Sequence, residues 1–111
     1  MNDRELKRIA LEFRKGILAG SPSDMMCFAI CAPLESYLVV CHEFVTHMEE
    51  VDFGCVNHCW LRLEDGRILD PTADQFSGKT LKLPKVYLGE VPEIYAKWMA
   101  EAGRQAERMS R

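Results

Sequence analysis

Three residues of the types needed for nucleophilic catalysis occur along the chain: Cys27, His58 and Asp70. A thiol can attack a carbonyl carbon, an imidazole can take and return the proton, and a carboxylate can hold the imidazole in one tautomer. The order Cys, His, Asp therefore predicts acyl-transfer chemistry through an acyl-enzyme.

The position of Cys27 favours it as the nucleophile. Residues 25–40 are predicted to be helical, so Cys27 falls in or near the first turn, where unpaired N–H groups and the helix dipole stabilise a thiolate. Cys31 lies one turn further along the same face and is the alternative nucleophile. The effect of the dipole fades at that depth, so we expect Cys31 to be a core residue.

The turn at residues 64–66, Glu-Asp-Gly, predicts where His58 and Asp70 lie relative to each other. A three-residue loop with Gly66 in the left-handed conformation pairs Trp60 with Asp70 across a hairpin. Because side chains alternate along a strand, His58 shares the face of Trp60, and Asp70 is its diagonal neighbour at about 7 Å. A two-residue loop would shift the register by one and place Asp70 on the opposite face.

The rest of the pattern predicts an α+β fold, with helices around a small antiparallel sheet. Apolar residues at helical spacing predict an amphipathic helix over residues 3–18 and a closing helix that begins near Pro92. Alternation and turn residues predict strands over residues 43–51, 56–63, 67–69 and 85–88.

The cysteine-bearing helix over residues 25–40 is apolar on nearly every face, which predicts burial on most sides. Ser23 or Asp24 is the expected N-cap. Pro33 is expected to kink or split the helix, because proline removes a backbone hydrogen bond and crowds the preceding turn.

Several strings in the sequence resemble the papain-like, transglutaminase-like cysteine hydrolases, and in particular small bacterial and phage members of that superfamily. The strings are NHCWLRL at residues 57–63, DGRILDPTADQF at 65–76, MCF at 26–28, PLESYL at 33–38 and LPKVYLG at 83–89, followed by Tyr95. The resemblance implies a papain-like domain over residues 1–111. It also implies that Cys27 is the nucleophile, His58 the general base and then acid, and Asp70 the orienting group.

The sequence departs from papain at the oxyanion hole. Papain has a glutamine before its cysteine, and residues 21–26 offer no such amide. The backbone N–H of Cys27 is one expected donor, and Asn57 or Gln75 is a candidate for a second. Trp60, on the face of His58, is a candidate for positioning the substrate. The chain is also too short for papain's second lobe, so either the cleft is shallow or a partner completes it.

A zinc site is the alternative chemistry. Its ligands would be drawn from Cys55, His58 and Cys59, with Cys41 and His42 completing the set. This spacing matches no recognised zinc finger or ribbon, so we expect the cysteines other than Cys27 to be packing residues and expect neither a metal nor another cofactor.

Composition limits the class of protein further. The 111 residues suffice for one domain with a single core, and the net charge of −3 is concentrated in residues 21–93, which carry −7. Such an acidic middle disfavours nucleic-acid binding. The N-terminal residues carry no apolar signal segment and no apolar run reaches membrane-spanning length, so we expect a cytoplasmic protein with reduced thiols and no membrane partner.

The sequence thus predicts a cysteine-dependent hydrolase or acyltransferase that acts on an amide, peptide or thioester bond of a peptide, protein or small acyl substrate. The alternative is a catalytically silent papain-like module that binds a protein partner or a small ligand. A long distance between Cys27 and His58, or a pocket filled by side chains, would favour the binding module.

Overall fold

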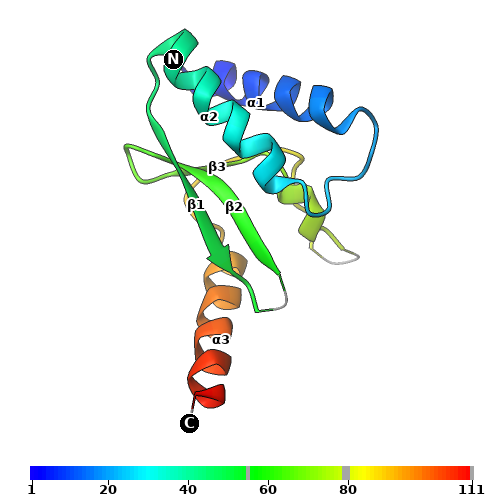
Figure 1. Ribbon diagram of the computed structural model, residues 1–111, viewed down its shortest axis with the longest axis vertical. Helices are drawn as coiled ribbons and strands as arrows, with labels where there is room; N and C mark the ends of the chain where they lie inside the picture. Colours follow the sequence, from blue (N-terminus) through cyan, green and yellow to red (C-terminus); the bar gives the residue numbers. More distant parts are fainter. Residues whose placement is uncertain (55, 79–80, 111) are drawn as a thin grey trace.

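The computed structural model describes residues 1–54, 56–78 and 81–110, and in this part of the chain three α-helices accompany a four-stranded antiparallel sheet (Figure 1). The elements in chain order are α1 (Asp3–Leu18), α2 (Cys27–His42), β1 (Thr46–Asp52), β2 (Asn57–Leu63), β3 (Ile68–Asp70), the 3-10 helix η1 (Ala73–Phe76), β4 (Tyr87–Gly89) and α3 (Glu93–Met109). The strands follow one another in the order β1-β2-β3-β4, so chain neighbours are also sheet neighbours. The α+β prediction is confirmed.

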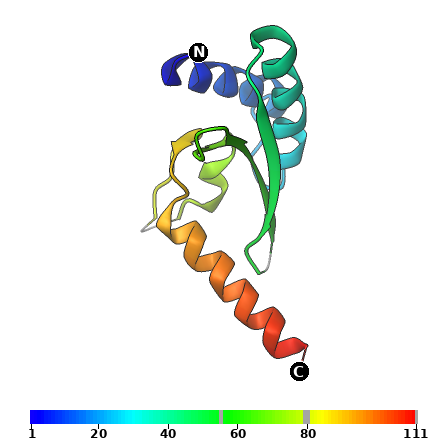
Figure 2. The same ribbon diagram turned by 90° about the vertical axis from the view of Figure 1, so that its left-hand side faces the viewer.

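The helices lie on different sides of the sheet. Helices α1 and α2 pack together on one face, whereas the first turns of α3 pack on the other and its last residues, 103–110, are exposed (Figure 2). Each face of the sheet therefore has its own core. The cores are Leu6, Ile9, Cys31, Leu34, Leu38, Cys59, Leu61 and Leu69 on the α1–α2 side, and Phe53, Trp60, Ile68 and Tyr95 on the α3 side.

Helix α1 has the bounds that the sequence predicts. The side chain of Asn2 accepts a hydrogen bond from the N–H of Glu5 at 2.8 Å, which satisfies one of the unpaired donors of the first turn. The helix ends where Ala19 adopts the left-handed conformation with φ 48°.

Helix α2 is Cys27–His42, two residues later at each end than the predicted residues 25–40. It differs from the prediction in three further ways. Its N-cap is Met26, which makes no side-chain capping bond, because the hydroxyl of Ser23 donates instead to Asp74 at 2.8 Å and Asp24 is exposed. Of the two predicted effects of Pro33, a kink or a split, the split does not occur. Both Pro33 and Ala29, the residue whose carbonyl loses its helical partner, are exposed, so water can satisfy that carbonyl.

Burial of α2 on most sides is the third prediction that the structure corrects. Ile30, Leu34 and Leu38 are fully buried, but Phe28 is 59% exposed and Val40 is 77% exposed. Only the face of α2 toward the sheet and α1 is covered. The outer face is also apolar, so the composition of the helix alone does not indicate which face is buried.

The hairpin between β2 and β3 has the predicted register. Leu61 pairs with Leu69 and Arg62 with Ile68, a register that places Trp60 opposite Asp70. The loop is the three-residue type, since the N–H of Leu63 donates to the carbonyl of Arg67 at 2.8 Å and Gly66 has φ 92°. The face shared by His58, Trp60 and Asp70 is therefore set by this turn.

All four predicted strands shift in their bounds, by one residue for β2 (Asn57–Leu63) and β3 (Ile68–Asp70) and by more for β1 and β4. Helix α2 continues to His42 and ends on Glu43, whose φ of 51° is left-handed, so β1 begins only at Thr46 and not at residue 43. The last strand is Tyr87–Gly89, which lies later than the predicted residues 85–88.

Substitution of two glycines should have opposite effects on stability. A Cβ added at Gly66 or at Gly16 meets no atom within 4 Å, but only Gly66 has a positive φ. Gly66→Ala should lower the free energy of unfolding by about 1–2 kcal/mol through backbone strain. Gly16→Ala, in the interior of α1, should raise it by about 0.5–1 kcal/mol. Urea unfolding of both variants measures this, and equal effects would contradict the assigned turn.

Candidate active site

His58 and Asp70 form the centre of the site. The Nε2 of His58 lies 2.7 Å from Oδ2 of Asp70, and both side chains are completely buried. Their relation follows from the hairpin, which brings the two residues to the same face as diagonal neighbours. The predicted side-chain contact is confirmed.

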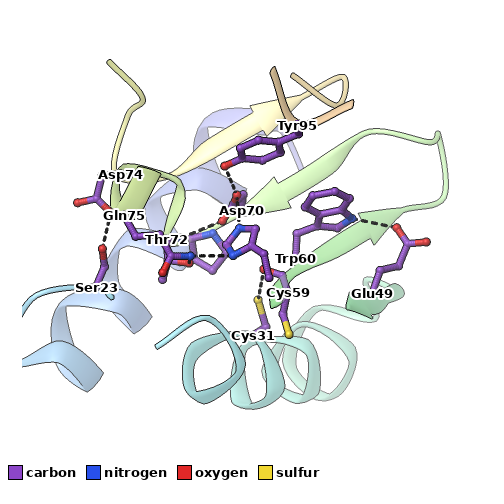
Figure 3. A network of polar contacts seen from close by, with 12 residues as sticks. Ser23, Cys31, Glu49, Cys59, Trp60, Asp70, Thr72, Asp74, Gln75 and Tyr95 are labelled. Atoms are coloured by element: carbon purple, nitrogen blue, oxygen red, sulfur yellow. Dashed lines mark hydrogen bonds and ion pairs between the residues drawn. The ribbon is translucent and has the colours of Figure 1, made fainter. Parts of the chain in front are cut away.

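The carboxylate of Asp70 accepts hydrogen bonds from three described donors (Figure 3). Oδ2 accepts from the Tyr95 hydroxyl at 2.7 Å as well as from His58, and Oδ1 accepts from the backbone N–H of Thr72 at 3.1 Å. Burial and the neighbouring Asp70 charge both raise the pKa of Tyr95, so its hydroxyl keeps the proton that it donates. A buried carboxylate is tolerable only with such partners, and here they also fix its orientation.

Cys27 is the first residue of α2, and interaction of its thiol with His58 lowers the thiol pKa. Burial raises the pKa of this thiol, but the hydrogen bonds to His58 and to the backbone of Cys59 outweigh burial, and the pKa is lowered. For His58, burial opposes the charged form, while the interactions with Asp70 and with Cys27 raise the pKa above its ordinary value. These opposite shifts favour a thiolate and imidazolium pair.

The other described thiols differ from Cys27. Burial raises the pKa of Cys31 far above the ordinary thiol range, and burial together with the Cys27 charge raises the pKa of Cys59 to about 12. Cys31 donates to the carbonyl of Cys59 at 3.7 Å and belongs to the core, as the sequence predicts. Cys41 is exposed at the far end of α2, and Cys55 lies outside the described residues.

Gln75, from η1, contacts the second nitrogen of the imidazole. Its Nε2 lies 2.7 Å from Nδ1 of His58, and its Oε1 accepts from the N–H of Met25 at 3.1 Å. The Met25 donor identifies Oε1 as the carboxamide oxygen, so the group facing Nδ1 is the NH₂. An N–H can donate only to an unprotonated nitrogen, so this contact opposes the protonation that Asp70 and Cys27 favour.

Of the three residues considered for the oxyanion or the substrate, Gln75 alone contacts the triad directly by hydrogen bond among the described contacts. Asn57 is exposed, and its amide donates to Glu50 at 3.2 Å. Trp60 is 1% exposed, its indole N–H donates to Glu49 at 2.9 Å, and its ring stacks on Tyr95 with centroids 5.7 Å apart. Trp60 thus packs against Tyr95, which contacts Asp70, and exposes no surface to which a substrate could bind.

Phenylalanines enclose the imidazole. The ring of Phe76 meets His58 edge-on at 4.8 Å, and that of Phe53 lies 5.6 Å away. With His58 fully buried and Cys27 only 7% exposed, the described site is closed and dry. A dry environment strengthens the ionic and hydrogen-bonding interactions of the triad.

A group of residues that supports the site was missed from the sequence. Arg14 forms a two-pronged ion pair with Asp74, both contacts at 2.7 Å, and also donates to the carbonyls of Pro71 and Lys85 at 3.0 and 3.1 Å. Ser23 donates to the same carboxylate. The available signal was the position of Arg14 four residues after Ala10 on the buried stripe of α1, where a charge requires a partner.

Comparisons with known proteins assign the chain to no group, since no protein-family model, curated protein or solved structure matches it. Among the described residues, no group of three or more Cys, His, Asp or Glu side chains is arranged to hold a metal ion, and Cys55 of the alternative zinc set is not among them. In the same part of the chain, no helix combines the length and hydropathy needed to cross a bilayer.

Tyr95→Phe tests the role of the hydroxyl that contacts Asp70. Removing a buried donor to a charged acceptor should lower the free energy of unfolding by about 1.5–3 kcal/mol. Tyr37→Phe is the matched control, because Tyr37 is 37% exposed and its change should be close to zero. Equal values for the two variants in urea unfolding would show that the contact with Asp70 adds no stability.

Asp74 should make stability depend on pH in the acid range. Burial raises its pKa, but the hydrogen bonds from Arg14 and Ser23 outweigh burial and lower the pKa. A carboxyl with a lowered pKa stabilises the fold above its unfolded value of about 3.9, and this contribution is lost as the pH falls through the folded value.

Asp74→Asn should therefore lower the free energy of unfolding by about 1–3 kcal/mol at neutral pH. The difference from the parent protein should shrink in acid, as urea unfolding across pH would record. Asp24→Asn, at an exposed position, serves as the control. A difference that persists unchanged in acid would contradict the ion pair.

Proposed function

We propose that the chain is a papain-like cysteine hydrolase or acyltransferase that acts in the cytoplasm on an amide, peptide or thioester bond. The observation that carries the proposal is the contact of His58 with Asp70 at 2.7 Å, together with the pKa of Cys27, which the same imidazole lowers. A thiol, a base and an orienting carboxylate in this relation are the groups that acyl transfer requires.

The proposed reaction uses the two imidazole nitrogens differently. Nε2–H donates to Asp70 throughout, which keeps Nδ1 available for the proton of the Cys27 thiol. The Cys27 sulfur attacks the carbonyl carbon, and the Nδ1 proton passes to the leaving group as the bond to that group breaks. Water or an amine then attacks the thioester, which gives hydrolysis or transfer and returns the thiol.

The N-terminus of α2 supports the same reaction. Met26 provides no side-chain cap, so the first-turn N–H groups of Cys27 and Phe28 have neither a capping nor an intrahelical acceptor. Such groups stabilise a thiolate before attack and an oxyanion after it. The motif resemblance over residues 57–76, where the triad base and carboxylate occur, points to the same chemistry.

A binding module is the second candidate, and the closed site favours it. Full burial of His58 and the 7% exposure of Cys27 leave little room for a substrate carbonyl in the described state. In this reading the buried polar contacts of Asp70 are structural, and a partner binds the exposed outer surface of α2.

Alkylation of Cys27 separates the two candidates. The rate with iodoacetamide should rise with pH at a midpoint below the ordinary thiol pKa of about 8.5, because the pKa of Cys27 is lowered. His58→Ala should move this midpoint up, since the imidazolium that stabilises the thiolate is removed. Cys41→Ser, at an exposed position outside the site, should leave both the rate at Cys27 and its midpoint unchanged.

Turnover completes the test. Intact mass spectrometry after incubation with thioester and activated-amide donors should show an acyl adduct on Cys27. Asp70→Asn should slow acyl turnover roughly a thousandfold while affecting alkylation much less, because it disturbs the orientation of the base more than the thiolate. A protein that labels first at another cysteine, or whose alkylation ignores His58, would favour the binding module.

A further inference from the structure

Nδ1 of His58 has two competing partners. In the proposed reaction Cys27 gives its proton to this nitrogen, whereas Gln75 already donates to it at 2.7 Å. Nδ1 has one lone pair, so it cannot hold the Cys27 proton and accept from the Gln75 N–H at the same time. The protonation state of the imidazole at neutral pH therefore depends on which partner occupies Nδ1.

The carboxamide of Gln75 cannot turn over to relieve this conflict. If the amide were reversed, its NH₂ would face the N–H of Met25, two donors with no acceptor between them. The NH₂ also lies 3.5 Å from the hydroxyl oxygen of Thr72, which can accept from its second hydrogen. Gln75 leaves Nδ1 only if the side chain or the segment that carries it moves.

Contacts of the preceding residue, Asp74, and of Met25 on the segment before α2 hold Gln75 in place. Asp74, the preceding residue, is bound by Arg14 and by Ser23, which ties η1 to the segment before α2. Met25, on that segment, has φ 62°, a left-handed conformation unfavourable for a methionine, although its side chain is 85% exposed and gains nothing from packing. The strained residue is the one that contributes the N–H bonded to Gln75.

We propose that Gln75 is a latch on the general base: its carboxamide occupies Nδ1 of His58 in the resting protein and must leave before Cys27 can be activated. This inference rests on the proposed function, whose site it regulates. In the latched state the imidazole is neutral, Nε2 carries the ring proton and Cys27 keeps its thiol proton.

Release of the latch moves one proton and breaks no bond to carbon. The Cys27 proton passes to Nδ1, leaving a thiolate beside an imidazolium, so the net charge of the site is unchanged. Among the described residues, the titratable groups that act on His58 are Cys27 from α2 and Asp70 from β3, with Tyr95 of α3 bonded to the same carboxylate. None of these competes for Nδ1 except Cys27, so the state of the latch decides when the ion pair forms.

Gln75→Met removes the hydrogen bond and keeps the length of the side chain. Iodoacetamide should then label Cys27 about threefold to tenfold faster at neutral pH, because the loss of one buried hydrogen bond frees Nδ1. The pH midpoint of labelling should fall in parallel. Gln105→Met, at an exposed position on α3, is the control and should match the parent protein.

The parent protein provides a second readout that needs no variant. In ¹⁵N NMR of the imidazole at neutral pH, Nδ1 of His58 should resonate as an unprotonated acceptor and Nε2 as a protonated nitrogen. In Gln75→Met both nitrogens should be protonated. Should that variant fail to fold, the parent spectrum alone decides, since a protonated Nδ1 there overturns the latch.

The failure of the latch and the failure of the proposed function give different results. Labelling of Cys27 that depends on His58 but is unchanged or slower in Gln75→Met overturns the latch and leaves the hydrolase intact. Labelling that ignores His58 overturns the proposed function, while the NMR signal of Nδ1 still shows whether Gln75 holds the imidazole neutral.

Discussion

The buried carboxylate of Asp70 is the constraint on which the rest of the structure depends. A charge removed from water requires hydrogen bonds, and each of its donors comes from a different part of the fold: His58 from β2, Tyr95 from α3, and Thr72 from the turn after β3. Displacing any of these elements would remove a hydrogen-bond donor from the buried carboxylate. The site and the packing of the sheet against α3 are thus stabilised by the same contacts.

Sequence reasoning succeeded where local chemistry decides the geometry. The Glu-Asp-Gly loop needs a left-handed glycine, and once Gly66 supplies it the register of the hairpin and the contact between His58 and Asp70 follow. Both features depend on residues close together in the chain.

Features that depend on distant residues could not be predicted. Ser23 looked like an N-cap because its own segment offers it that role, but Asp74, fifty-one positions away, competes successfully for its hydroxyl. Arg14 is buried because its guanidinium forms an ion pair with the same carboxylate. The apolar composition of α2 predicted burial all round, and only the packed structure shows that one of its faces has no covering element within the described chain.

The burial of the imidazole explains how a hydrogen bond from Gln75 could regulate the general base His58. A dry site strengthens the attraction between a thiolate and an imidazolium, but it equally strengthens any neutral hydrogen bond that competes with that pair. Phe53 and Phe76 pack against the buried imidazole and shield it from solvent. In the proposed latch, Gln75 and Cys27 compete for Nδ1, and the balance between their interactions with this nitrogen sets the reactivity of the thiol.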